Sequence, residues 1–554
     1  MNRLICFMIA LLWAPVGYAQ GVSEGVSAPL KLGDVPAEIE AKKPVLYTQA
    51  VDVDQLTVIE FDGTGTLDAE GLGANVWQKS HMNEVIPLIQ SLPNRIYQPL
   101  TRSLTLKALL TNARPPEGVS DGRFFEARAY KLLQMGQLTE FSKLVLALPN
   151  TLSTPGLDKL RFHNFFAKNR GEEACRRVPR YVEDMPDDIF WQQAELLCLL
   201  DQQNIPQAAF KYRLLQEQET GFSPTFQRLL GAAFGEYNDD MVQTDLPEPW
   251  ALMDVYLYLK SPYALSDEQV VAHLTTASPA VISVLAHSLQ IDNSLRIWAA
   301  EQSERFGGFP LADLTKLYDS ILMAAVDLTD AVGVYENAGA NRTFAAIYQS
   351  LKGARNSRSF TQELTHVFSL DLDYAARSQL SRLFIGKVRD IPPSVEMADF
   401  ADTAIQVLTL ADSAEAALPW EGAKQQLAEK GKEPLPISSL YNPDVLKKVS
   451  EAGDTGQLPY GLRLNLYYLT TNKAFLNGIN VDPLQIKEIN LGASYLISTY
   501  SAENQMGNTY LSFLQEGVKN PLALRAFLQG LVMTGKEALV KQLYQEAVGF
   551  YLYE

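Results

Sequence analysis

The chain has 554 residues and carries 47 basic against 64 acidic side chains, a formal net charge of −17 at pH 7. Binding of nucleic acids and other polyanions requires a basic face, so an acidic chain of this kind argues against such partners. The acidity mainly favours solubility.

The first residues have the three parts of a secretory signal. Arg3 is the basic region, residues 4–14 are an apolar run, and Gly17 and Ala19 are the small residues before Gln20. We therefore expect cleavage between Ala19 and Gln20 and a periplasmic location. The apolar run is shorter than the roughly 20 residues of a membrane span, and we expect no span after signal removal. An uncleaved N-terminal anchor is the alternative.

The next two segments differ in composition. Residues 20–45 are rich in Gly, Ser, Pro and charge without an apolar period, which is typical of a flexible tether. Residues 55–62 alternate in part between apolar and polar, and residues 63–65 are turn formers, so residues 66–69 can return as a second strand. We expect this β-hairpin to pack on the segments after it in the chain, because an isolated hairpin is marginal in water.

From residue 76 the apolar residues recur at helical spacing almost to the C-terminus. Between residues 123 and 238 the helical segments come in pairs, with turn residues spaced by 35, 33 and 34. These turn residues are Gly136, Gly171, Asn204 and Asn238. Gly and Asn most readily adopt the left-handed conformation that ends a helix. A period near 34 is typical of tetratricopeptide repeats, whose hairpins stack on one another. An irregular bundle with coincidental spacing is the alternative.

The remaining pattern completes an all-α prediction: a tetratricopeptide-like α-solenoid of stacked helical hairpins with a small N-terminal β-hairpin. In chain order we expect a signal peptide at 1–19, a flexible tether at 20–45, a β-hairpin segment at 46–75, tetratricopeptide-like repeats at 76–248, irregular helical hairpins at 249–417, a linker-like segment at 418–460 and a C-terminal helical capping region at 461–554. The linker-like segment is richer in Lys, Gly and Pro than its surroundings.

Two cysteines come after the predicted signal, Cys175 and Cys198. An even count in an oxidising compartment permits one disulfide, and both residues lie in helical segments of neighbouring hairpins. Cysteine is also a common buried residue. The disulfide and two buried thiols both remain open.

Motifs that suggest catalysis lack their structural context. The G-x-S-x-G at residues 118–122 comes after two prolines in a loop between helices, whereas a nucleophile elbow joins a strand to a helix. We expect Ser120 to cap the helix that starts near Arg123. Residues 60–68 superficially resemble an aspartyl-phosphate loop, but Glu60 stands where that chemistry requires Asp. We interpret them as a turn.

No metal or cofactor site is expected. The five histidines are His81, His163, His273, His287 and His366. None of them is spaced as a metal pair on one helix face, and there is no H-E-x-x-H or C-x-x-C motif. No phosphate-binding glycine loop with its lysine occurs. The Glu-Ser dipeptide of lytic transglycosylases, which are periplasmic helical superhelices with a catalytic domain, is absent as well.

Several segments carry a family resemblance. They are residues 65–68 and 74–77, residues 103–111, residues 188–194 (DIFWQQA) and residues 522–526. Together they resemble uncharacterised exported helical-repeat proteins of alphaproteobacteria, sometimes mislabelled "antifreeze glycopeptide polyprotein". The resemblance implies a periplasmic helical-repeat protein and brings no activity or catalytic residues.

The sequence therefore favours a scaffold or protein-binding module of the cell envelope with no catalysis of its own. Stacked hairpins form a concave surface suited to a protein or peptide partner. Tyr130, Tyr212 and Trp191 are candidate groove residues, although Trp191 also suits the core. The alternative is a non-catalytic subunit or accessory factor of a cell-wall-processing, motor or secretion complex.

Overall fold

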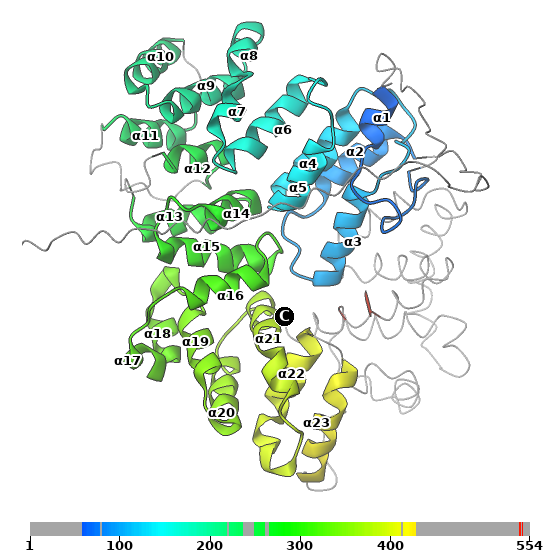
Figure 1. Cartoon of the computed structure of the whole chain (residues 1–554), viewed down its shortest axis with the longest axis vertical. Coiled ribbons are helices and arrows are strands. Elements are labelled where there is room, and N and C mark those ends of the chain that lie inside the picture. The colour runs from blue at the N-terminus through cyan, green and yellow to red at the C-terminus, as the bar shows by residue number, and fades with distance from the viewer. Residues whose placement is uncertain are drawn as a thin grey trace, which may run out of the picture. The chain divides into compact units, whose positions relative to one another are not determined.

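The computed structural model describes residues 58–77, 80–218, 221–235, 249–260, 265–411 and 414–427, together with residues 542, 543 and 546. They all lie in the second of two compact units, Leu56–Glu554. Their regular secondary structure is helical, so the all-α class predicted from the sequence is confirmed for these residues (Figure 1). None of their helices combines the length and the apolar character that crossing a bilayer would require.

Most helices pack against their neighbours in the sequence. The first are α1 (Val58–Gly63), α2 (Met82–Ser91), α3 (Pro99–Leu110), α4 (Arg123–Gln134), α5 (Leu138–Leu146) and α6 (Pro155–Phe166). Next come α7 (Gly171–Cys175), α8 (Val178–Asp184), α9 (Ile189–Asp201), α10 (Ile205–Glu217), α11 (Pro224–Ala233) and α12 (Leu252–Tyr258). They are succeeded by α13 (Asp267–Leu274), α14 (Pro279–His287), α15 (Asn293–Arg305), α16 (Leu311–Asp319), α17 (Ala325–Thr329) and α18 (Ala331–Asn337). The last are η4 (Gly339–Asn341), α19 (Ala345–Gly353), α20 (Ser357–Phe368), α21 (Tyr374–Arg389), η5 (Val395–Phe400), α22 (Ala401–Ala411) and α23 (Ala414–Leu427).

Local sequence explains where many of these helices begin. The side chains of Thr154, Asp188 and Ser223 each accept a hydrogen bond from a backbone N–H in the first turn of the adjoining helix. Proline stands in the first turn of α6, α10, α11 and α14, where its missing N–H is not needed.

Four helix ends repeat one backbone conformation at nearly constant spacing. Gly136, Asn169, Gln203 and Gly235 have positive φ values of 71°, 55°, 59° and 77°, at intervals of 33, 34 and 32 residues. At the first three, the next N–H bonds to the carbonyl five residues before it. These bonds are Gln137 to Leu132 (3.0 Å), Arg170 to Phe165 (2.9 Å) and Asn204 to Leu199 (2.8 Å). This pattern closes the last turn of a helix and reverses the chain.

The predicted turn at Gly136 is confirmed, and two others are displaced. Asn169 rather than Gly171 takes the left-handed conformation, and Gln203 rather than Asn204 does so at the next turn. The left-handed conformation costs about 1–2 kcal/mol for a residue with an ordinary side chain such as glutamine. A glutamine in the sequence therefore does not indicate this turn. The predicted turn at Asn238 lies outside the described residues.

The predicted β-hairpin within residues 46–75 is wrong where the structure describes it. Residues 58–63 form helix α1 rather than a strand. Leu67 makes an isolated parallel bridge with Thr111, after α3, instead of pairing with the preceding segment. A short, partly alternating run of apolar residues fits both a strand and a helical turn. Contacts with α4 favour the helix here.

Asp62 and Arg128 make those contacts. The buried Asp62 carboxylate accepts hydrogen bonds from the N–H groups of Gly122 and Phe125, both at 3.0 Å, and so caps α4. Arg128 on α4 is fully buried and donates in turn to the backbone carbonyls of Asp62 (2.7 Å) and Thr64 (2.6 Å). Burial lowers the pKa of Arg128 to about 10, which leaves the guanidinium charged at neutral pH. The two side chains lock α1 onto α4.

Two clusters of buried apolar side chains form the core. One is built mainly from residues 61–160, and the other runs from residue 162 to residue 420. Tyr97, Leu138 and Leu252 pack against both clusters. The core is thus continuous through the region where α5 lies against α14.

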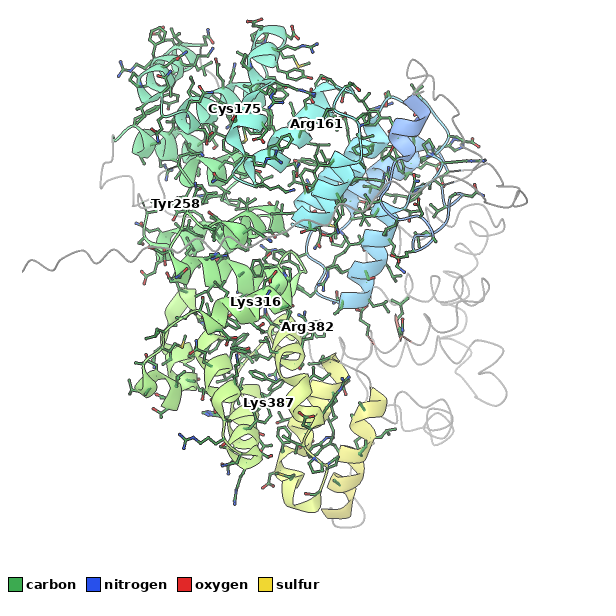
Figure 2. The ribbon with its side chains drawn as sticks, viewed as in Figure 1. Arg161, Cys175, Tyr258, Lys316, Arg382 and Lys387 are labelled. Atoms are coloured by element: carbon green, nitrogen blue, oxygen red, sulfur yellow. A yellow bond between two sulfur atoms is a disulfide. The ribbon has the colours of Figure 1, made fainter. Side chains whose placement is uncertain are left out.

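A buried polar network joins the middle helices to the later ones. The fully buried Glu301 on α15 accepts hydrogen bonds from the Tyr318 hydroxyl and the Phe344 N–H, both at 2.7 Å. One turn later, Glu304 pairs with Arg382 on α21, at the position marked in Figure 2. Burial raises the pKa of Glu301, and the charge of Arg305 opposes that rise.

Part of the predicted linker at 418–460 is helical. Residues 418–427 belong to α23, and Trp420 is buried there against Phe400, with 5.5 Å between the ring centroids. Residues 428–460 lie outside the described part of the chain.

Candidate functional site

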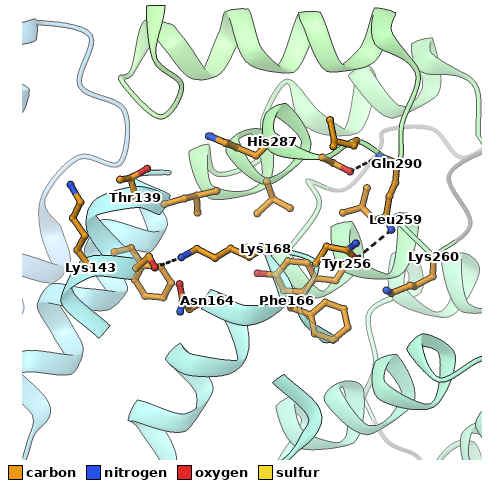
Figure 3. A pocket seen from close by; sticks show the side chains of 18 residues that line it. Thr139, Lys143, Asn164, Phe166, Lys168, Tyr256, Leu259, Lys260, His287 and Gln290 are labelled. Atoms are coloured by element: carbon orange, nitrogen blue, oxygen red, sulfur yellow. Dashed lines mark hydrogen bonds between the residues drawn. The ribbon is translucent and has the colours of Figure 1, made fainter. Parts of the chain in front are cut away.

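A cavity of about 610 Å³ opens between the α5–α6 hairpin on one side and α12 and α14 on the other (Figure 3). Its floor consists of four buried apolar or aromatic side chains, one from each helix. These are Phe141, Phe166, Tyr256 and Val284. Its volume lies within the range of about 300–1,000 Å³ that is usual for ligand pockets.

One buried polar side chain in the cavity wall has no partner among the described residues. Asn164 on α6 is 2 % exposed, and neither its amide nitrogen nor its carbonyl oxygen makes a hydrogen bond there. A buried amide without partners costs on the order of 1–3 kcal/mol. Such groups are rare in folded proteins and require an explanation, such as a bound water, ion or ligand.

Among the described residues, three lysines line the cavity, and no Asp or Glu does so. Lys168, just after α6, donates to the Ser142 hydroxyl, and Lys260, just after α12, pairs with Asp201. Lys143 on α5 is exposed and forms no ion pair within the described part of the chain. Loss of water and the nearby Arg170 charge lower the pKa of Lys168. The cavity is therefore locally basic in a chain that is acidic as a whole.

A buried histidine lies behind the floor. The Nδ1 atom of His163 is 3.3 Å from the Tyr256 hydroxyl. Burial, together with the Lys159 charge, lowers the pKa of His163 to about 3, so the ring is neutral at physiological pH. It supports the floor and carries no charge into the cavity.

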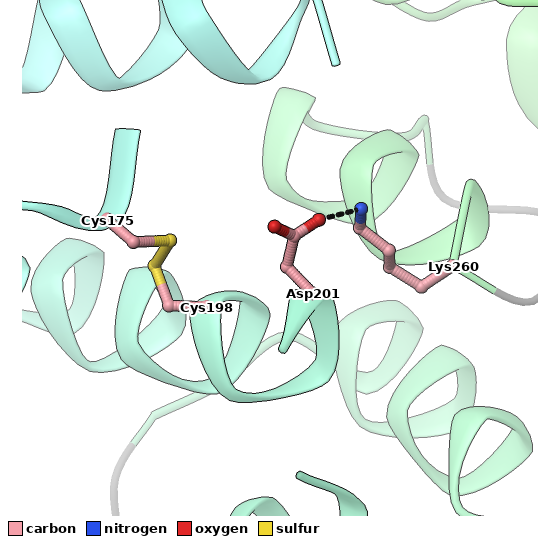
Figure 4. Close-up of a disulfide and its surroundings, with 4 residues drawn as sticks. All are labelled: Cys175, Cys198, Asp201 and Lys260. Atoms are coloured by element: carbon pink, nitrogen blue, oxygen red, sulfur yellow. Dashed lines mark hydrogen bonds and ion pairs between the residues drawn. A yellow bond between two sulfur atoms is a disulfide. The ribbon is translucent and has the colours of Figure 1, made fainter. Parts of the chain in front are cut away.

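A disulfide joins Cys175 at the end of α7 to Cys198 on α9 (Figure 4). One turn after Cys198, Asp201 forms the ion pair with Lys260, as the figure also shows. A Cβ atom at Gly171 would lie 1.9 Å from the Asp201 carboxylate, so a larger residue there would displace that carboxylate. The disulfide-bonded helix pair thus holds one lysine at the cavity edge.

The other residues singled out from the sequence lie elsewhere. Tyr130 is 49 % exposed, whereas Tyr212 and Trp191 are buried, with Trp191 stacked on Tyr181 at 4.3 Å. No group of His, Cys, Asp and Glu suited to a metal ion occurs in the residues that the structure describes. The predicted cleavage site at Ala19 and Gln20 lies outside them.

The expected role of Ser120 needs correction. Helix α4 does begin at Arg123, but its cap residue is Gly122, which has no side chain that could bond the first turn. The Ser120 hydroxyl donates to Asp62 at 2.8 Å instead, and Asp62 satisfies the N–H groups of the first turn. A long-range cap of this kind replaces the local one expected from the sequence.

Sequence reasoning did not single out Asn164, Lys143, Lys168 or Lys260. Each belongs to a common residue type on a helical segment, and no spacing relates them. Their shared feature is spatial, since α5, α6, α12 and α14 meet only in the folded chain.

Comparison of the chain with protein-family models, with curated proteins and with solved structures finds no match.

Proposed function

We propose that this protein is a helical-repeat scaffold that binds a protein or peptide partner in the periplasm and has no catalytic activity of its own. The observation that carries the proposal is the open basic cavity between packed helical hairpins, with its unpartnered Asn164. A binding site of this kind needs no reactive group.

The repeated helix ends support a tetratricopeptide-like solenoid. Positive-φ residues recur every 32–34 residues between Gly136 and Gly235, near the period of that repeat class. Consecutive helices pack against one another, as stacked hairpins require. The segments similar to exported alphaproteobacterial helical-repeat proteins favour the same architecture.

The periplasmic location rests on the signal-like first 19 residues. The disulfide between Cys175 and Cys198 is consistent with it, because such bonds persist in oxidising compartments.

In vivo cross-linking tests the proposal. An epitope-tagged full-length chain is expressed in its host, the cells are fractionated, and proteins cross-linked to it are identified. We expect the chain in the periplasmic fraction, joined to a specific envelope protein. Retention in the cytoplasm would refute the location. A purified chain that stays without a partner and hydrolyses peptidoglycan would refute the scaffold function.

A further inference from the structure

We propose that the cavity between α5, α6, α12 and α14 binds an acidic peptide segment of the partner protein, with a carboxylate at Lys143 or Lys168, a peptide group at Asn164 and an apolar side chain on the floor. This inference rests on the proposed protein-binding function and adds the chemistry of the ligand.

The charges select a carboxylate. Lys260 is already neutralised by Asp201, whereas Lys168 bonds only a hydroxyl and Lys143 has no ion pair among the described residues. No acidic side chain from the described part of the chain lines the cavity to satisfy them. A carboxylate that reaches Lys143 or Lys168 forms a charge-assisted hydrogen bond, which is stronger than a neutral one.

Asn164 selects a peptide. Its side chain offers one carbonyl acceptor and an amide donor, and a peptide group offers the matching N–H donor and carbonyl acceptor. A single peptide group matches both sides of an amide that is otherwise unpartnered and 2 % exposed, and because both polar atoms are covered, side chains of the cavity wall must move for it to bind. An isolated carboxylate could accept from the Asn164 amide nitrogen but could not satisfy its carbonyl oxygen.

The floor and edge select an apolar neighbour for the acid. Phe141, Phe166 and Val284 present apolar surface at the base of the cavity, and Leu289 at its edge is 79 % exposed. A peptide with an aliphatic or aromatic residue beside its acidic residue covers this surface while its carboxylate reaches the lysines. In Figure 3, Lys168 reaches toward α5, and the Lys143 side chain extends away from it at the outer side of the cavity.

A random peptide library displayed on phage is the probe. It is selected on the full exported chain and on the K143E/K168E variant, in which both substituted positions are exposed. We expect the wild-type chain to enrich peptides with Asp or Glu next to an apolar residue, and we expect charge reversal to weaken their binding at least about tenfold. The K316E/K352E variant, which reverses two exposed lysines outside the cavity, should bind them like the wild type.

The N164L variant separates binding from stability. Leucine has a similar size and removes a buried amide that has no described partner, so the melting temperature should stay unchanged or rise. Affinity for the selected peptides should fall about tenfold. A marked loss of stability would instead give Asn164 a structural role and overturn its assignment.

The possible outcomes distinguish failure of the acidic-peptide inference from failure of the proposed scaffold function. Enriched peptides without acidic residues, or peptides that bind K143E/K168E as tightly as the wild type, refute the acidic-peptide inference. If an envelope protein cross-links equally to the wild type and to K143E/K168E, the scaffold function is supported, but the cavity is refuted as the binding site. Failure to obtain either a peptide or a cross-linked protein refutes both.

Discussion

Asp62 is a buried carboxylate that acts as a helix cap from a distant part of the chain. It satisfies the Gly122 and Phe125 N–H groups and accepts from Ser120. Asp62→Ala should therefore lower the free energy of unfolding by about 2 kcal/mol, since two buried N–H groups lose their acceptor. Thermal unfolding monitored by circular dichroism measures the change.

Asp68→Ala is the matched control for this prediction. Asp68 also accepts a side-chain hydrogen bond, from Asn112 at 2.9 Å, but it does so in an exposed position. Its removal should change stability by less than about 0.5 kcal/mol. Equal effects of the two substitutions would contradict the capping role of Asp62.

His163 predicts a dependence of stability on pH. Its pKa falls from an ordinary value of 6.5 to about 3 in the folded chain because the ring is buried. Between these pH values the unfolded chain binds a proton that the folded chain rejects, so acidification favours unfolding. The penalty is absent above pH 6.5 and grows by up to about 1.4 kcal/mol per pH unit below it.

The His163→Gln variant tests this dependence. We expect the melting temperature of the wild type to fall more between pH 7.5 and pH 5 than that of the variant. Because each protein is compared with itself at the two pH values, the effect of the substitution on stability at pH 7.5 cancels. His81→Gln, at a side chain that is 58 % exposed, should behave like the wild type. Parallel pH profiles for all three proteins would refute the prediction.

At the scale of elements, the disulfide links α7 to α9 across a sequence separation of 23 residues. A cross-link over a loop of this length stabilises a fold by about 3 kcal/mol, mainly by restricting the unfolded chain. C175S/C198S should therefore melt at a lower temperature than the wild type. Reductant should lower the melting temperature of the wild type and leave the double variant unchanged. Two reactive thiols in the native protein would contradict the bond.

Glu546 links the C-terminal part of the chain to α3. Its carboxylate accepts hydrogen bonds from the Leu100 N–H (2.6 Å), the Thr101 N–H (3.0 Å) and the Thr101 hydroxyl (2.6 Å). These are unsatisfied groups of the first helical turn, where a negative charge is favourable. Glu546→Ala should speed amide hydrogen exchange in the first turn of α3, measured by mass spectrometry. Exchange in the first turn of α9, capped by Asp188, should not change.

At the scale of the whole molecule, the helical class and part of the repeat pattern were predictable. Apolar residues at helical spacing and prolines in first turns are local signals, and Gly136 ends its helix as expected. The predictions that were wrong rested on local signals, which contacts with distant parts of the chain overrode. Residues 58–63 form a helix from which Asp62 caps α4, and Gln203 has a left-handed conformation that its residue type does not indicate.

The candidate site was not predictable from the sequence. Lys143, Asn164 and Lys260 carry no motif, and an unpaired buried amide is visible only once its surroundings are known. The net charge of −17 even conceals the basic cavity, because a sum over the chain says nothing of how charges are distributed in space.

By itself, the sequence determined the acidic net charge, the helical class and a period near 34, because each depends on composition or on residues within a few turns of one another. Only the tertiary structure decided which acid caps α4, that Cys175 bonds Cys198, and that three lysines and Asn164 line one cavity. These features join residues far apart in the chain, and the folded backbone alone brings them within contact distance.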